Sequence, residues 1–209
     1  MKIELETVKP EEIEKRSFEI IRSELITPPN PKLEPVILRA IHTTADFEYA
    51  DSLYFSPGVI PAALDALKNG AHIITDTNMA LSGINKAALK KLGCEALCFM
   101  ADDDVAAAAK SDGTTRAVAS MNKAAALDGS LVFAIGNAPT ALIRLYELID
   151  TGRISPALII GAPVGFVNVI QSKELIMQTK VPCIVARGRK GGSNVAAAIV
   201  NALMYMMTR

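Results

Sequence analysis

Short apolar runs alternate with helical patterns of hydrophobic residues from about residue 71 to the end of the chain. The runs predicted as strands are HIIT (72–75), EALCFM (95–100), SLVFAIG (130–136), ALIIGAP (157–163) and CIVARG (183–188). The patterns predicted as helices between them cover 85–92, 114–127, 138–150 and 195–207. Continuously apolar strands separated by helices are typical of a parallel sheet covered on both faces. We therefore predict an α/β fold of three layers, with an open, mainly parallel sheet of about five strands and helices on both faces.

The first 70 residues follow a different pattern, in which amphipathic helices dominate. The predicted elements are helices over 10–25, 31–46 and 59–70, the last closed by Gly70, and a short extended piece over 53–58 that ends in a turn. No Ser/Gly linker, composition break or internal repeat separates this part from the rest. The sequence predicts one domain over 1–209, with 1–70 as an N-terminal helical segment packed on it.

Charge and composition restrict the class of protein. Lys plus Arg equals Asp plus Glu at 22 each, so the net charge is zero. This balance argues against non-specific binding to nucleic acid or to an anionic membrane, which requires a basic face. The charged start shows no signal peptide, and no run approaches the roughly 18 apolar residues of a membrane span. We expect a cytoplasmic protein that binds neither nucleic acid nor membrane.

The chain has three cysteines, Cys94, Cys98 and Cys183. Because their number is odd and the sequence has no export signal, we predict that they are reduced thiols. Cys94 and Cys98 lie in a run that looks like a buried strand. No histidine or further cysteine lies near them to complete a metal site. We predict packing rather than metal binding for this pair.

Four predicted strands end in loops rich in Gly, Pro, Asn, Asp and Ser. These loops cover 76–83, 136–142, 161–168 and 187–194. In open parallel sheets, ligands bind beyond the carboxyl ends of the strands. Glycine and proline also simply end strands, but four such loops at corresponding ends favour a shared ligand mouth, in which Asn137 is one candidate residue.

The loop RGRKGGSN (187–194) combines basic side chains with Gly191 and Gly192, and Ser193 or Asn194 can cap the helix that follows. A helix N-terminus offers free N–H donors to phosphate or carboxylate. A solvated basic turn is an equal alternative. The nucleotide motifs G-x-x-x-x-G-K-[ST] and G-x-G-x-x-G are absent, so the sequence gives poor support to nucleotide binding.

Arg116 stands at a predicted helix start, where its charge opposes the helix dipole. This placement suggests a role such as binding a carboxylate, although a plain surface arginine is as compatible with it.

His42 is one of two histidines, and its place on the helix over 31–46 tells against a core role. The apolar arc of that helix comprises Leu33, Val36, Ile37, Ala40, Ile41 and Thr44. Arg39, His42 and Asp46 cluster on the opposite arc, toward solvent, a partner subunit or a pocket. By position alone a solvated histidine is favoured. His72 lies in a buried-looking run, and no G-x-S-x-G or H-E-x-x-H motif is present, so His42 is the natural candidate for acid–base work.

A set of motifs in order along the chain resembles the precorrin-8X methylmutase family, isomerases of the cobalamin pathway. The motifs are Ser17-Phe18, R-x-x-H at 39–42, LYFSP at 53–57, DTNM at 76–79, TR at 115–116, GNAPTAL at 136–142, PVGFV at 163–167 and RGRKGGS at 187–193. The match covers nearly the whole chain. The stretch IHTTADFEYA (41–50) resembles the cobalt-dependent branch.

The resemblance implies migration of a methyl group from C-11 to C-12 of a corrinoid macrocycle. It implies that His42 is the catalytic histidine, which protonates or hydrogen-bonds a ring nitrogen, and that Ser17, Arg39 and Arg116 contact the substrate. It also implies a homodimer with sites near the subunit interface. We expect no cofactor and no metal site, because a rearrangement needs no donor and any cobalt belongs to the substrate. The candidate substrate-binding residues are Ser17, Arg39, Arg116, Asn137, Gly191, Gly192 and Ser193.

Two other classes remain open at this stage. A non-catalytic corrinoid carrier would keep the carboxylate-binding groups and would be indifferent to loss of His42. A nucleotide-dependent α/β enzyme would use the 187–194 loop for phosphate.

Overall fold

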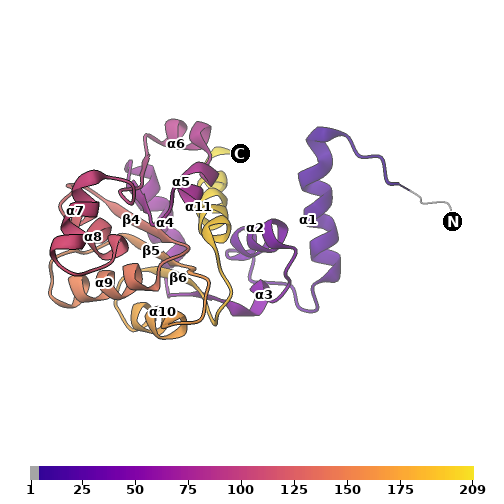
Figure 1. The fold of residues 1–209 in the computed structure, drawn as a ribbon. Coiled ribbons are helices and arrows are strands. Elements are labelled where there is room, and N and C mark those ends of the chain that lie inside the picture. Colours follow the sequence, from indigo (N-terminus) through magenta and orange to yellow (C-terminus); the bar gives the residue numbers. More distant parts are fainter. Residues whose placement is uncertain (1–4) are drawn as a thin grey trace.

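A computed structural model describes residues 5–209 as one sheet with helices around it (Figure 1). The strands are β1 (Leu53–Phe55), β2 (His72–Thr75), β3 (Glu95–Leu97), β4 (Leu131–Ile135), β5 (Leu158–Gly161) and β6 (Cys183–Ala186), in the order β1-β6-β5-β4-β2-β3. Five strands are parallel, and β1 pairs with β6 in the antiparallel direction. The predicted fold class and its five strands are confirmed. The extended piece over 53–58 supplies a sixth strand that was not predicted.

Helices cover both faces of the sheet. They are α1 (Ile13–Glu24, after the 3₁₀ turn Pro10–Glu12), α2 (Glu34–Thr44), α3 (Tyr49–Ser52), α4 (Val59–Lys68), α5 (Asn78–Gly83), α6 (Lys86–Leu92), α7 (Asp103–Ser111), α8 (Arg116–Ala124), α9 (Pro139–Asp150), α10 (Val169–Met177) and α11 (Ser193–Thr208). No helix of residues 5–209 is long and apolar enough to cross a membrane.

Alternate residues of the central strands point to two separate cores. Val132 and Ala134 join the core beneath α2, α4, α6 and α11, whereas Phe133 and Ile135 join the core beneath α8, α9 and α10. This two-residue alternation is the geometry of a strand with both faces buried, which explains why the strands are apolar throughout. The three layers follow from it.

The N-terminal helical segment reaches the rest of the fold through α2. Helix α2 packs on α11, and α1 packs on α2 but otherwise extends away from the body (Figure 1). The buried side chain of Ile21 faces α2, while Ile13 and Ile20 on α1 are exposed. The division into one domain over 1–209 stays a prediction.

Several local elements differ from the sequence-based expectation. Residues 78–83, predicted as loop, form α5, and neither α7 nor α10 was predicted. The face of α10 that packs inward is Val169, Ser172, Lys173 and Ile176, so two polar residues conceal its apolar periodicity. The run with Cys94 and Cys98 is not a buried strand: β3 forms the sheet edge and both thiols are half-buried.

Candidate active site

His42 lies on the solvent-facing side of α2, as the helical periodicity predicts. Its imidazole is exposed and meets the edge of the Phe18 ring, with ring centroids 5.4 Å apart and planes at 79°. The groove between α1 and α2 forms a shallow hollow of about 250 Å³ around it. The hollow is lined by Ser17, Ile20, Ile21, Glu24, Ile41, His42, Ala45 and Phe47. The structure therefore brings Ser17 and His42 to one surface that is apolar except for a few polar groups.

Arg39 is held firmly one helical turn before His42. Its guanidinium donates to both carboxylate oxygens of Glu14, at 2.8 and 3.0 Å, and lies over the rings of Phe18 and Tyr205 at 4.8 and 5.1 Å. The hydrogen bond from Arg39 lowers the pKa of the Glu14 carboxyl. Arg39 Nε is buried and has no acceptor within residues 5–209. An incoming carboxylate must therefore compete with Glu14 for this guanidinium.

The end of α2 is tied to the loop after β6. The ammonium of Lys190 lies 2.6 Å from a carboxylate oxygen of Asp46 and 2.6 Å from one of Glu48. Hydrogen bonds to these two carboxylates raise the pKa of Lys190. A second groove of about 260 Å³ runs between α2, α5 and α11, and its lining includes Arg39, Thr43 and Asn194. The first turn of α11, which follows the loop, and the arginine of α2 thus border one surface.

At the carboxyl edge of the sheet, a buried carboxylate joins two of the predicted ligand loops. Asp76, at the end of β2, is fully buried and accepts the N–H groups of Gly136, Asn137 and Ala138 at 2.9, 2.8 and 2.6 Å. Burial raises its pKa, and the three N–H donors act in the opposite direction. The strand order reverses between β2 and β4, which is the position where open α/β sheets bind ligands.

The start of α11 is packed into the same edge. The Ser193 hydroxyl lies 2.7 Å from that of Thr77, and the Gly192 N–H donates to the Ala162 carbonyl at 2.8 Å. A Cβ on Gly191 would lie 2.1 Å from the Ala162 carbonyl oxygen, so only glycine fits there. All four predicted loops therefore meet at this edge.

The prediction that Ser193 or Asn194 caps α11 is wrong. Gly192 is the N-cap residue and no side chain caps the helix, because the Ser193 hydroxyl is turned toward Thr77.

Arg116 is the first residue of α8 and its side chain is exposed. It forms no ion pair within the described part of the chain. The hydroxyl of Thr115 caps α8 and lies 3.2 Å from that of Thr140, which places Arg116 beside the loop that carries Asn137. Helix α8 and helix α2 cover opposite faces of the sheet (Figure 1). A single chain does not unite Arg116 with His42.

His72 lies at the amino end of β2, the end remote from these loops, with Nδ1 3.3 Å from a Glu95 carboxylate oxygen. Within residues 5–209, no group of three or more His, Cys, Asp and Glu side chains is arranged to hold a metal ion.

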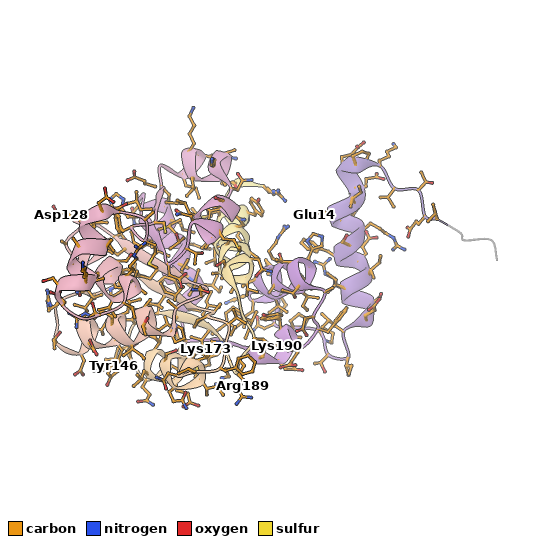
Figure 2. All side chains as sticks on the ribbon, viewed as in Figure 1. Glu14, Asp128, Tyr146, Lys173, Arg189 and Lys190 are labelled. Atoms are coloured by element: carbon orange, nitrogen blue, oxygen red, sulfur yellow. The ribbon has the colours of Figure 1, made fainter. Side chains whose placement is uncertain are left out.

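Lys173 is a residue of this region that sequence reasoning missed. Its side chain is 1% exposed, and the ammonium donates to the carbonyls of Gly188 and Lys190 at 2.9 and 2.8 Å. Burial lowers its pKa to about 8. Figure 2 shows Lys173 near Arg189 and Lys190, where α10 meets the end of the 187–194 loop. The available signal was its spacing from Val169 and Ile176, which places a lysine on the inward face of a helix.

Comparison with known proteins gives consistent matches along the chain. The model of the family described as "Precorrin-8X methylmutase" matches residues 12–206. A cobalt-precorrin-8 methylmutase of Salmonella typhimurium is 45% identical over 94% of this chain and 95% of its own length, and one of Priestia megaterium is 44% identical over 96% and 89%. The crystal structure titled as a precorrin-8X methyl mutase from Thermus thermophilus superimposes with a TM-score of 0.85 at 41% identity, covering 93% of this chain and 96% of that one.

Proposed function

Because the chain belongs to the precorrin-8X methylmutase family, we propose that it moves a methyl group from C-11 to C-12 of a corrinoid macrocycle. It is an isomerase of cobalamin biosynthesis. The proposed substrate is cobalt-precorrin-8 and the product cobyrinate, in line with the residues 41–50 and with the names of the two relatives. The metal-free pair would be precorrin-8X and hydrogenobyrinate.

The proposed catalytic residue is His42, which donates a proton to a ring nitrogen next to the migrating centre. The observation that carries this assignment is its exposed imidazole, on a rigid helix, at the hollow that Ser17 also lines. The bond from C-11 to the methyl group breaks and the bond to C-12 forms with the same electron pair. Protonation of the conjugated ring makes the receiving carbon electron-poor, and the proton is returned when the methyl group has moved. Substrate and product are isomers, so the proposed reaction needs no cofactor; cobalt, where present, is part of the substrate.

The proposed substrate contacts are spread over two surfaces. The macrocycle carries acetate and propionate arms, which suit the guanidinium groups of Arg39 and Arg116. The remaining proposed contacts are Ser17, Asn137, Gly191, Gly192 and Ser193. Because α2 and α8 lie on opposite faces of the sheet, we propose a homodimer in which a second copy covers the hollow at His42 and the exposed Ile13 and Ile20 of α1. The proposed compartment is the cytoplasm, where three free cysteines stay reduced.

The test of the catalytic role is the pair His42→Ala and His42→Asn, with His72→Asn as the matched control. General acid catalysis contributes about 100- to 10,000-fold, so both His42 variants are expected to lose that much kcat while they still bind cobyrinate. The control is expected to keep wild-type turnover, because His72 lies at the amino end of the sheet. Turnover is followed by the change in visible absorbance as the ring rearranges.

Near-normal turnover of either His42 variant rejects the acid role, and binding without any turnover by the wild type indicates a carrier. Thermal-shift measurements with cobyrinate, hydrogenobyrinate, NAD and ATP complete the experiment. Stabilisation by a corrinoid and by neither nucleotide is the expected result. Sedimentation in solution tests the dimer, since one chain has a mass of 22.2 kDa.

A further inference from the structure

Lys173 is a buried ammonium whose hydrogen-bond partners within residues 5–209 are backbone carbonyls. It lies on α10 with 1% of its side chain exposed, and no acidic side chain within residues 5–209 forms an ion pair with it. Proteins rarely bury a lysine completely without a carboxylate partner, because removing the charge from water costs several kcal/mol. Its two hydrogen bonds therefore offset the cost of its burial and indicate what the ammonium holds in place.

The two carbonyls that Lys173 binds belong to the loop after β6. The Gly188 and Lys190 carbonyls accept from its ammonium, and the Arg189 carbonyl between them accepts the Gly165 N–H at 3.2 Å. Three successive carbonyl groups of the loop are therefore engaged by α10 and by the loop after β5. Lys173 contributes two of these three attachments.

This attachment leaves the N–H groups of the loop unused. Those of Arg189, Lys190 and Gly191 have no acceptor within the described residues, and the same holds for the N–H groups of Ser193 and Asn194 at the start of α11. Free N–H groups in a loop and at a helix start are donors that suit a carboxylate. The hydrogen bonds to the carbonyls hold the backbone that carries these donors.

Two arginines of the loop carry a charge that no ion pair within residues 5–209 offsets, whereas Lys190 is paired with Asp46 and Glu48. Arg187 lies over the ring of Tyr54 at 4.9 Å and Arg189 over the ring of Phe166 at 5.5 Å, and both arginines are exposed. The ammonium of Lys173 donates to two carbonyls of the same loop. Its charge is uncompensated by a carboxylate, so it adds to the attraction for an anion at the loop surface.

We propose that Lys173 is a positioning residue that holds the 187–192 loop in the shape that binds a carboxylate arm of the corrinoid, without touching the macrocycle itself. The inference rests on the proposed function and deepens it. Since the loop binds an arm that does not react, its contacts are the same in the ground state and the transition state. Loss of such contacts raises KM and leaves kcat unchanged.

The test replaces the ammonium by an apolar group of similar length, Lys173→Met, in the full-length protein. The matched control is Lys180→Met, because Lys180 is exposed and forms no hydrogen bond or ion pair within the described residues. For Lys173→Met we expect KM to rise about tenfold and the Kd of cobyrinate to rise in parallel, with kcat within about twofold of wild type. The control is expected to match the wild type in all three.

If the methionine variant does not fold, the same measurements are made on Lys173→Gln. Its amide donates to one carbonyl, so an intermediate KM is expected. A wild-type KM in either folded variant, or a loss of kcat at unchanged KM, overturns the positioning role, as does failure of both variants to fold. If the wild-type protein itself neither binds nor converts the macrocycle, the proposed function fails first, which distinguishes the two failures.

Discussion

The surface around His42 and the carboxyl edge of the sheet carry candidate residues on two different kinds of support. At His42, one helix packs on another through few buried side chains, and the polar groups are held by partly exposed ion pairs such as Arg39 with Glu14. At the sheet edge, the groups are held by buried backbone contacts: Asp76 to three N–H groups, Gly192 to Ala162, and Lys173 to two carbonyls.

The two surfaces differ in how freely their groups can move. The sheet edge has little freedom to move, because its loops touch backbone to backbone and its buried Asp76 and Lys173 are held by several hydrogen bonds each. The α1–α2 surface leaves an imidazole exposed in a shallow hollow and a carboxylate that an incoming ligand can displace from Arg39. We expect a large substrate to require adjustment at the α1–α2 surface and a fixed frame at the sheet edge.

The largest expected change in stability comes from replacing Gly191, one of two glycines compared in the loop after β6. Gly191→Ala would bring a Cβ within 2.1 Å of the Ala162 carbonyl oxygen, so the backbone must shift. We expect the free energy of unfolding to fall by about 3 kcal/mol or more, measured by urea denaturation. The control, Gly188→Ala, has φ of +72° and no atom within 4 Å of its new Cβ, and we expect a loss of only about 1–2 kcal/mol. Equal losses would contradict the interlocked edge.

A smaller effect is expected from the titration of Lys173. Burial lowers its pKa to about 8 in the folded protein, from 10.5 for an exposed lysine, so between these pH values the unfolded chain binds a proton that the folded protein lacks. The free energy of unfolding should therefore rise as pH rises from about 8 to 10.5, by roughly 2–3 kcal/mol from this group. Denaturation at several pH values measures it. Lys173→Met should lack this part of the rise, and identical slopes in the two proteins would show that the lysine is charged throughout.

The smallest effect concerns the end of the helix that carries His42. Ala45 closes α2 in a left-handed conformation, with φ of +54°, which costs a residue with a Cβ about 1 kcal/mol. Ala45→Gly should raise the free energy of unfolding by up to about 1 kcal/mol. Ala107→Gly, in the exposed interior of α7, should lower it by a similar amount. A loss of stability in both variants would mean that Ala45 is not strained.

Much of the fold follows from local patterns. The five apolar runs are strands at nearly their predicted residues, and the periodicity of α2 correctly exposes His42 while Val36, Ile37 and Ala40 are buried. Helix α10 was not predicted because two polar residues, Ser172 and Lys173, occupy buried positions on its inward face. The extended piece at 53–58 could be predicted as extended, but its pairing with β6, more than 120 residues away in the chain, could not.

The sequence by itself determined the α/β class, the exposed arc of α2, the four loops at the strand ends and the family to which their motifs belong. These properties depend on short-range periodicity and turn chemistry, which neighbouring residues carry. Only the tertiary structure decided that Asp76 ties β2 to the loop 60 residues later, that Thr77 meets Ser193 across 116 residues, and that Arg39 is paired with Glu14. Such contacts arise when separate elements pack, and no local pattern encodes which polar groups that packing brings together.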